Sequence, residues 1–318
     1  MKGYILGAGP AGLIAAYYLP HFNVIGLKPE ESSFSLGPRL LHKTNNMLEL
    51  VNNISGDKHT INIEKIKIRY KVDNAIYSEI PKGFKEKYVE ITRKINTSEE
   101  SHLSEGKSTI EHITLDDFGK ESYKIFIKEL FESVYPNFFI EGKVFKINNN
   151  HILYTSANYD VIKKKYDTLI NTISLKEFCK LNKKVSNTIT EKYYEVVDLT
   201  TINKNFYKCE YKDIIKILIK NKVKMYDYMY SIDGDYTRKT FFKDYIVYET
   251  TNIVKDNKIE DNLILEKKEN LPIQIKSSLC IENIDNIYFL GRYAQWDHKV
   301  KINEVLDRVI KLQEEIYG

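Results

Sequence analysis

The segment from residue 3 to residue 19 constrains the fold more than any other part of the sequence. Residues 3–6 (Gly-Tyr-Ile-Leu) predict a buried strand, residues 7–12 read Gly-Ala-Gly-Pro-Ala-Gly, and residues 13–19 have a helical apolar pattern. A GxGxxG motif between a strand and a helix is typical of dinucleotide-binding proteins. Its first glycine allows a tight turn, its second lets the backbone approach a pyrophosphate, and its third lets the helix pack close to the strand.

This motif supplies the first candidate cofactor-binding residues, which are Gly7, Gly9, Pro10, Ala11 and Gly12. The amino terminus of the predicted helix would offer free N–H groups and the positive end of its dipole to phosphates.

The fingerprint also has an acidic residue that binds a ribose hydroxyl about 20 residues further on, after the second strand. That strand is predicted at residues 24–27, and Glu30 is the candidate acid. A solvated loop carboxylate beside Pro29 is the alternative interpretation of Glu30.

Charge and cysteine content exclude several other classes. The 48 Lys and Arg residues are balanced by 44 Asp and Glu residues and mostly interleaved with them, so no concentrated basic face for nucleic acid is predicted. The three cysteines have no CxxC spacing and the histidines no HxxxH spacing, so neither a disulfide framework nor a metal site is predicted. The sequence contains no apolar run of about 18 residues, so no membrane span is predicted. With a fold motif in place of a signal peptide, we expect a soluble, cytoplasmic protein.

Residues 37–46 read Gly-Pro-Arg-Leu-Leu-His-Lys-Thr-Asn-Asn, and a helix is predicted over residues 47–52. This segment resembles the Gly-Pro-His-aliphatic-Phe-His-Thr-Asn segment of the UDP-galactopyranose mutases, which are flavoproteins with a doubly wound FAD-binding domain. His42 matches the second histidine of that segment, whereas Arg39 replaces the first, which lies close to the flavin. A hairpin predicted over residues 66–81, with its turn at residues 73–74, is similar to the hairpin that comes next in the family's sequences.

Later segments continue the resemblance in the family's order. Residues 235–238 (Asp-Tyr-Thr-Arg) resemble the family's Tyr-Thr-Arg segment, whose arginine faces the nucleotide diphosphate. A planar guanidinium can bind a diphosphate through two parallel hydrogen bonds, which makes Arg238 a candidate catalytic residue. Without the resemblance, a surface arginine on a hairpin would be the preferred interpretation.

Two further regions would complete the FAD site. Residues 143–147 and 151–154 predict a strand pair in which Val144 would lie by the adenine, and residues 166–172 predict a strand that returns to the FAD domain. A strand over residues 286–290 opens into Gly291-Arg292, which closes the FAD site in the family. The apolar stripe of residues 305–312 then predicts an amphipathic helix.

The predicted fold class is α/β: a Rossmann-like, doubly wound FAD-binding domain with an inserted α+β substrate domain. The FAD-binding domain is expected to be discontinuous, and the domain boundaries are 1–56, about 140–180 and 278–318 for FAD, with about 57–139 and 181–277 for the substrate-covering domain. Within residues 207–225, the spacing of Ile214, Ile215, Leu218 and Ile219 predicts one face of a helix. The lysines at 163–165 and 183–184 are interpreted as solvated faces and not as phosphate sites.

The resemblance implies a mutase that interconverts the pyranose and furanose forms of a nucleotide sugar, UDP-galactose-like or a UDP-pentose. In that chemistry N5 of reduced FAD attacks the anomeric carbon and displaces the nucleoside diphosphate. We expect Arg238 to clamp the diphosphate, with Tyr236 and Trp296 beside the substrate. His42 and Arg39 are the other candidate catalytic residues and are expected on the flavin side, where Arg39 would also bind the cofactor. NAD(P)H is a candidate reductant, and a homodimer is a candidate assembly.

Departures from the family pattern keep two alternatives open. Arg39 replaces a histidine, Leu271-Pro272 replaces Tyr-Pro, and residues 101–137 have no counterpart of the uridine pocket. These losses favour an FAD-dependent oxidoreductase of the amine oxidase type, acting on a small amine or a modified nucleotide. The family's Gly-Gly pair after the second strand is also missing, because only about a dozen residues separate Leu27 from Arg39. This shortened FAD loop keeps open the second alternative, a non-catalytic scaffold that binds flavin or nucleotide.

Overall fold

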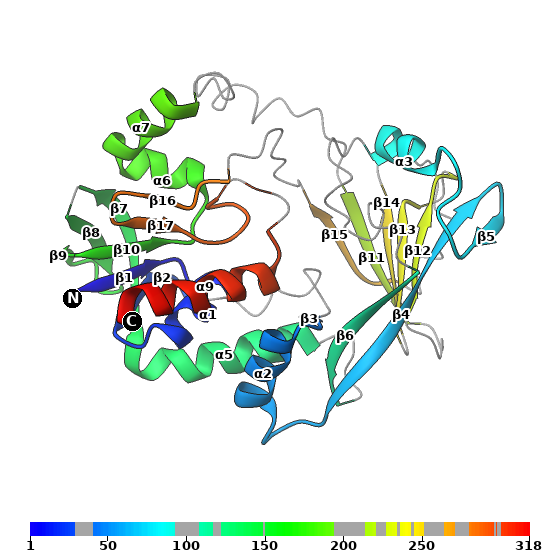
Figure 1. Ribbon diagram of the computed structural model, residues 1–318, viewed down its shortest axis with the longest axis horizontal. Helices are drawn as coiled ribbons and strands as arrows, with labels where there is room; N and C mark the ends of the chain where they lie inside the picture. Colours follow the sequence, from blue (N-terminus) through cyan, green and yellow to red (C-terminus); the bar gives the residue numbers. More distant parts are fainter. Residues whose placement is uncertain are drawn as a thin grey trace.

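Two sheets dominate the architecture and lie on opposite sides of the molecule in Figure 1. The computed structural model describes residues 1–28, 41–92, 108–116, 122–148, 150–193, 214–220, 227–233, 236–242, 245–250, 264–270, 280–295, 297 and 300–318. The helices in this part of the chain are α1 (Pro10–Tyr18), α2 (Asn45–Ser55), α3 (Phe84–Thr92), α5 (Ser122–Phe138), α6 (Leu175–Leu181), α7 (Lys183–Tyr193) and α9 (Ile302–Tyr317).

The first sheet has a parallel centre. β1 pairs in parallel with β10 on one side and β2 on the other, and β17 and β7 extend this parallel set. β8, β9 and β16 add antiparallel edges. In spatial order the strands are β16 (Asn283–Ile284), β17 (Ile287–Phe289), β10 (Thr168–Asn171), β1 (Gly3–Leu6), β2 (Phe22–Gly26), β7 (Phe139–Ile147), β8 (His151–Ser156) and β9 (Val161–Lys165). The predicted α/β fold class is confirmed.

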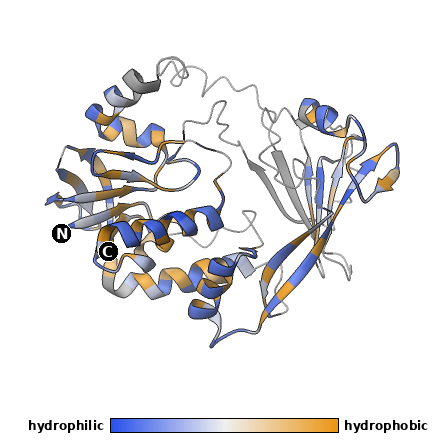
Figure 2. Cartoon of the chain, viewed as in Figure 1, coloured by the Kyte–Doolittle hydropathy of each residue, from blue (hydrophilic) through white to orange (hydrophobic). Residues whose placement is uncertain are grey.

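Alternating side chains of β1 enter two different cores. Ile5 belongs to the core shared with α1, α5 and α9, whereas Tyr4 and Leu6 belong to the core shared with α6. α1 contacts both α5 and α9, and its residues 13–16 are fully buried, which explains why its sequence is apolar on every side. α9 is amphipathic as predicted, and Figure 2 shows hydrophilic and apolar residues alternating along it.

The second sheet is mostly antiparallel. In spatial order its strands are β15 (Ile264–Asn270), β11 (Ile214–Lys220), β14 (Tyr245–Thr250), β13 (Arg238–Phe242), β12 (Asp227–Ser231), β4 (Ile61–Val72), β6 (Thr109–Leu115) and β3 (Leu41–His42), with β5 (Ala75–Tyr77) also paired to β4. The predicted β4–β5 hairpin is confirmed. Its turn residues Asp73 and Asn74 have φ of 50° and 65°, which is typical of a type I′ turn.

The helix predicted around residues 214–219 is wrong, because residues 214–220 form the strand β11 between β14 and β15. The sequence Ile-Ile-Lys-Ile-Leu-Ile-Lys places apolar residues at both helical and strand spacing over a segment too short to separate the two periods. Four β-branched isoleucines, one of them at position 217 between the apolar pairs used for the helix, favour the strand. The remainder of the range 207–225 lies outside the described residues.

Several other strand predictions are confirmed. The pair at residues 143–154 forms β7 and β8, and the returning strand is β10, which pairs with β1. The lysines at 163–165 lie exposed on β9, and those at 183–184 lie exposed on α7. The proposed domain boundaries stay a prediction. No helix in the described ranges is both long enough and apolar enough to cross a membrane.

One edge of the second sheet packs into a core of the first half of the molecule, which is the part built around the first sheet. Leu41 of β3, together with Ile113 and Leu115 of β6, belongs to the core formed by α1, α2 and α5. The register pair His42 and His112 lies on the opposite face of these two strands.

A chain of polar side chains reinforces this junction. Nδ1 of His59 lies 2.6 Å from Oδ2 of Asp116, and its Nε2 lies 3.2 Å from Oε1 of Glu129. The buried Glu129 also accepts a hydrogen bond from the hydroxyl of Ser55. The hydrogen bond to Asp116 raises the pKa of His59, although burial opposes it, and the same bond lowers the pKa of Asp116.

These shifts predict how stability depends on pH. The His59 contribution is present below its ordinary pKa of 6.5 and is lost as the pH rises through its raised value. The Asp116 contribution is present above 3.8 and is lost as the pH falls through its lowered value. The melting temperature of His59→Gln should therefore fall furthest below that of the unsubstituted protein near pH 5–6, and the gap should narrow toward pH 8.

The control for this experiment is His21→Gln, which removes an imidazole that contacts the ring of Tyr317. This variant measures the effect of losing an imidazole that contacts an aromatic ring and forms no ion pair with a carboxylate of the described residues. A gap for His59→Gln that stays constant from pH 5 to pH 8 would contradict the charged pair.

Candidate functional site

The turn after β1 is held in an unusual backbone conformation. Gly7 has a φ of +101°, which L side chains rarely adopt, and its N–H donates to the carbonyl oxygen of Ile25 on β2 at 2.9 Å. The hydroxyl of Thr172, directly after β10, donates to the carbonyl oxygen of Leu6 at 2.6 Å. The turn is therefore fixed from both neighbouring strands at the carboxyl end of β1.

The amino terminus of α1 is open to a ligand. Gly9 is the N-cap residue, with extended backbone and no side chain to cap the helix, and a methyl group added to it would meet no atom of the described residues within 4 Å. The first turn contains no acidic residue, so the positive end of the helix dipole is not compensated there. The first N–H groups of a helix have no partner within the helix, so this end of α1 is chemically suited to bind an anion.

The third glycine brings the helix against the turn. A Cβ atom at Gly12 would overlap the carbonyl oxygen of Gly7, so only glycine allows α1 to start this close to β1. Gly291, directly after Leu290, has a φ of +95°, and a Cβ added to it would lie 3.1 Å from that of Ala11. The carboxyl-terminal segment therefore closes over the first turn of α1, and the structure brings together the predicted residues Gly7, Gly9, Pro10, Ala11, Gly12 and Gly291.

Arg292 adds a positive charge beside this turn. Its Nε donates to the carbonyl oxygen of Val300 at 3.4 Å, and no carboxylate among the described residues forms an ion pair with it. Burial raises the pKa of the nearby Tyr123 phenol well above its usual range, and the charge of Arg292 opposes this rise. Arg292 directly follows Gly291, the residue that packs on Ala11 in the first turn of α1.

Val144 lies on the part of β7 that continues beyond the carboxyl end of β2. Gly26, the last residue of β2, pairs with Glu141, and Val144 follows at an irregularity in the β7–β8 pairing. Its half-buried side chain packs against the second core of the first sheet. Val144 therefore lies beyond the carboxyl ends of the parallel strands, as the glycine turn does.

A second group of polar side chains crosses one face of the second sheet. His42 pairs with His112 across β3 and β6, and their ring centres are 4.6 Å apart. The ring of the fully buried His112 lies 6.0 Å from that of Tyr228 on β12. Cζ of Arg238 lies 5.8 Å from the same tyrosine ring. We call His42, His112, Tyr228 and Arg238 the polar row.

The polar row ends in a partly buried ion pair. Nη2 of Arg238 lies 2.6 Å from Oε1 of Glu249, whose side chain is only 7% exposed. The pair is the cross-strand register pair of β13 and β14, so the carboxylate fixes the direction of the guanidinium. The other end of the row, at His42, lies at the junction with the first half.

Tyr236 does not join Arg238, although both were predicted to bind substrate. Its ring lies 4.0 Å from Nζ of Lys239, and its hydroxyl contacts the sulfur of Met229 at 3.1 Å. Lys239 and Met229 are a register pair, next to the pair of Arg238 with Tyr230. Since neighbouring residues of a strand point to opposite faces, Tyr236 and Arg238 lie on opposite sides of the sheet.

Three predicted residues, Glu30, Arg39 and Trp296, lie outside the described part of the chain. His112, Tyr228 and Glu249 were not predicted from the sequence. His112 alternates with apolar residues in Ile-Glu-His-Ile-Thr-Leu, a pattern that marks a strand and gives no signal of a site. Only the pairing of β6 with β3 reveals its place beside His42.

Comparisons with known proteins agree with this fold. No protein-family model and no curated protein matches the chain. Among solved structures, reduced UDP-galactopyranose mutase has a TM-score of 0.62 at 14% identity, over 100% of this chain and 94% of that one. An oxidoreductase from Methanosarcina mazei has 0.59 at 10%, over 99% and 100%. A putrescine oxidase redesigned in its cofactor binding has 0.55 at 8%, over 99% of both chains. The likeness therefore concerns the whole fold.

Gly9 and Gly12 should respond differently to substitution by alanine. Alanine in place of a helical glycine usually stabilises by about 1 kcal/mol. Gly12→Ala should instead destabilise by about 1–3 kcal/mol, because its methyl group must displace the Gly7 carbonyl. Gly9→Ala, where the same group meets nothing, should unfold at nearly the urea concentration of the unsubstituted protein. Equal midpoints for the two variants would contradict this geometry.

Proposed function

We propose that the chain binds FAD, with the diphosphate at the amino terminus of α1. The open space over Gly9 is the observation that carries this proposal, because backbone can approach a diphosphate only where no side chain intervenes. The uncompensated dipole of α1 and the charge of Arg292 supply attraction. Val144 would lie by the adenine, and Glu30 and Arg39 are proposed at the ribose and the flavin.

We propose further that the reaction is the mutase reaction on a nucleotide sugar. Bound and reduced, the flavin would supply a nucleophile for the anomeric carbon, which leaves the protein to position the sugar and stabilise the departing diphosphate. Arg238 suits the second task, because Glu249 holds its guanidinium in a fixed orientation on the face that carries His42. Structural likeness to a UDP-galactopyranose mutase supports this choice over other reactions of the fold.

His42 and Trp296 are proposed to wall the flavin-side cavity, with Trp296 beside the substrate. His112 is fully buried and its ring centre lies 4.6 Å from that of His42, so it would set the position of that ring and would not touch the substrate itself.

An oxidoreductase of the amine oxidase type is the second candidate. The charge of Arg238 is already neutralised by Glu249, so a diphosphate would have to compete with a buried carboxylate for it. A small uncharged or cationic substrate would meet no such competition. The structural likeness to an oxidoreductase and to putrescine oxidase is compatible with this second reaction.

The visible spectrum of the purified protein separates these functions. A mutase should show flavin bands whose reduced form, produced with dithionite or NADPH, changes when UDP is added. An oxidase should reduce its flavin with an amine and consume oxygen at each turnover, with no response to UDP. Protein that holds no flavin after reconstitution would refute both enzymatic proposals and leave the scaffold.

Arg238 and Tyr236 provide a matched pair for the substrate site. Arg238→Met should weaken UDP binding to the reduced protein by roughly 10- to 100-fold, the effect of losing a charge-assisted hydrogen bond of about 1.5–3 kcal/mol. Tyr236→Phe, on the other face of the sheet, should leave UDP binding unchanged. UDP binding would be measured from the reduced flavin spectrum. A large loss in Tyr236→Phe, or none in Arg238→Met, would show that the polar row is not the diphosphate site.

A further inference from the structure

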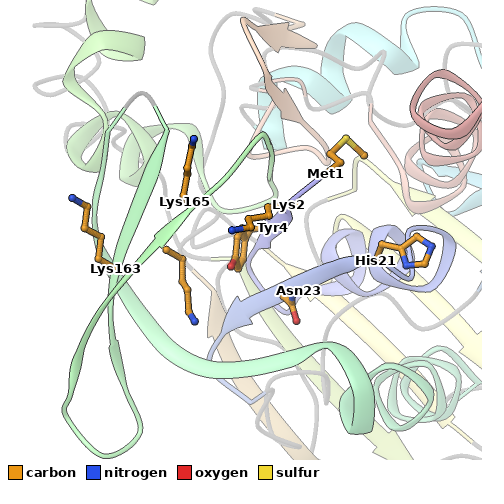
Figure 3. Close-up of a pocket in the computed structure, with 9 residues that line it drawn as sticks. Met1, Lys2, Tyr4, His21, Asn23, Lys163 and Lys165 are labelled. Carbon is orange, nitrogen blue, oxygen red and sulfur yellow. The ribbon is translucent and has the colours of Figure 1, made fainter.

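A cavity of about 440 Å³ lies at the end of β1 opposite to the glycine turn. Figure 3 shows Lys2 just before β1, Tyr4 on β1, His21 and Asn23 on the β2 side, and Lys163 and Lys165 on β9. Since β1 and β2 are parallel, the amino-terminal ends of both strands meet here. The four residues of β1, about 13 Å of extended chain, separate this cavity from the site at Gly9.

The wall of this cavity is strongly basic. Lys2 comes from the segment before β1, and Lys163, Lys164 and Lys165 come from β9. None of the described residues that line the cavity is acidic, and no ion pair joins these four lysines to a carboxylate in the described ranges. Asp167 is bound instead to the backbone, because its Oδ2 accepts the N–H of Lys2 at 2.7 Å.

The positive charge also reaches the neighbouring strand. His151 on β8 pairs with Lys165, and its pKa is lowered by burial first and then by the charges of Lys163 and Lys165. The ammonium groups of neighbouring lysines repel one another, and an anion bound among them would offset this repulsion.

Edge-strand protection explains only part of this arrangement. β9 is the last strand of the first sheet, and lysines on an edge strand hinder pairing with another chain. Lys2 and His21 are on other segments and would not serve that purpose. Their convergence on the same cavity as Lys163–Lys165 points to a ligand.

We propose that this cavity binds a small phosphate-bearing anion with at least two negative charges, which replaces the interpretation of Lys163–Lys165 as a solvated face alone. Lysine ammonium groups bind phosphate as point charges, and the Asn23 amide and the His21 imidazole add hydrogen-bonding groups. The volume is within the range of roughly 300–1,000 Å³ of small-molecule pockets, so an inorganic pyrophosphate or a nucleoside diphosphate would fit, and a polymer would not be enclosed.

Calorimetric titration of the full chain with inorganic pyrophosphate tests this proposal. The double variant Lys163→Gln/Lys165→Gln should bind about tenfold or more weakly, since two of the cavity's charges are removed. Lys183→Gln/Lys184→Gln removes the same charge from exposed positions on α7 and should bind as the unsubstituted protein does. Lys163, Lys165, Lys183 and Lys184 are all exposed, so both double variants are expected to fold, and thermal unfolding would verify this.

A third variant separates the two ends of β1. Gly9→Val closes the proposed FAD site but leaves the lysine cavity intact, so it should still bind pyrophosphate. An ADP titration of Gly9→Val then tells whether a nucleoside phosphate is accepted as well as free phosphate. Three results would overturn the proposal: equal weakening of pyrophosphate binding by the two double lysine variants, loss of pyrophosphate binding in Gly9→Val, and no binding by the unsubstituted chain at millimolar pyrophosphate. Binding of RNA without binding of pyrophosphate would overturn it as well.

Discussion

The close contact between the turn at Gly7 and the helix at Gly12 is the constraint on which the rest of the structure depends. It places the amino terminus of α1 directly beyond the carboxyl end of β1, where its free N–H groups face open space over Gly9. It also sets the height of α1 over the sheet, so that α5 and α9 can pack on it. The segment after Leu290 then closes on Ala11. The absence of a side chain at Gly12 thus determines both how α1 packs in the first half and where its candidate anion site lies.

Local features were predictable because local chemistry determines them. The glycine turn, the type I′ turn at Asp73 and Asn74, and the amphipathic α9 each follow from residues within one short segment. β11 was not predicted, because its run of apolar residues fits a helix and a strand equally in so short a length. Its pairing with β14 and β15 decided the outcome, and pairing with distant strands cannot be recognised from the segment alone.

The candidate site followed the same division. The residues of the FAD cradle were predictable because the motif itself defines their positions. The polar row was only half predictable: His42 and Arg238 stood out by resemblance, whereas His112 and Glu249 join them through the registers of two strand pairs. Tyr236 was grouped with Arg238 because both belong to the segment that resembles the family's Tyr-Thr-Arg. Tyr236 precedes β13 and contacts Lys239 and Met229 on the face opposite to Arg238. The register of β13 with β14 makes Glu249 the partner of the arginine.

Equilibrium titration of the flavin-free protein with FAD tests the central claim most directly, when it is carried out on the unsubstituted chain and on Gly9→Val. The account predicts one FAD per chain for the unsubstituted protein and, for the variant, a normally folded protein that binds FAD weakly or not at all, because the valine side chain fills the space for the diphosphate. Binding of FAD by the variant with unchanged affinity, or no binding by the unsubstituted protein, would contradict it.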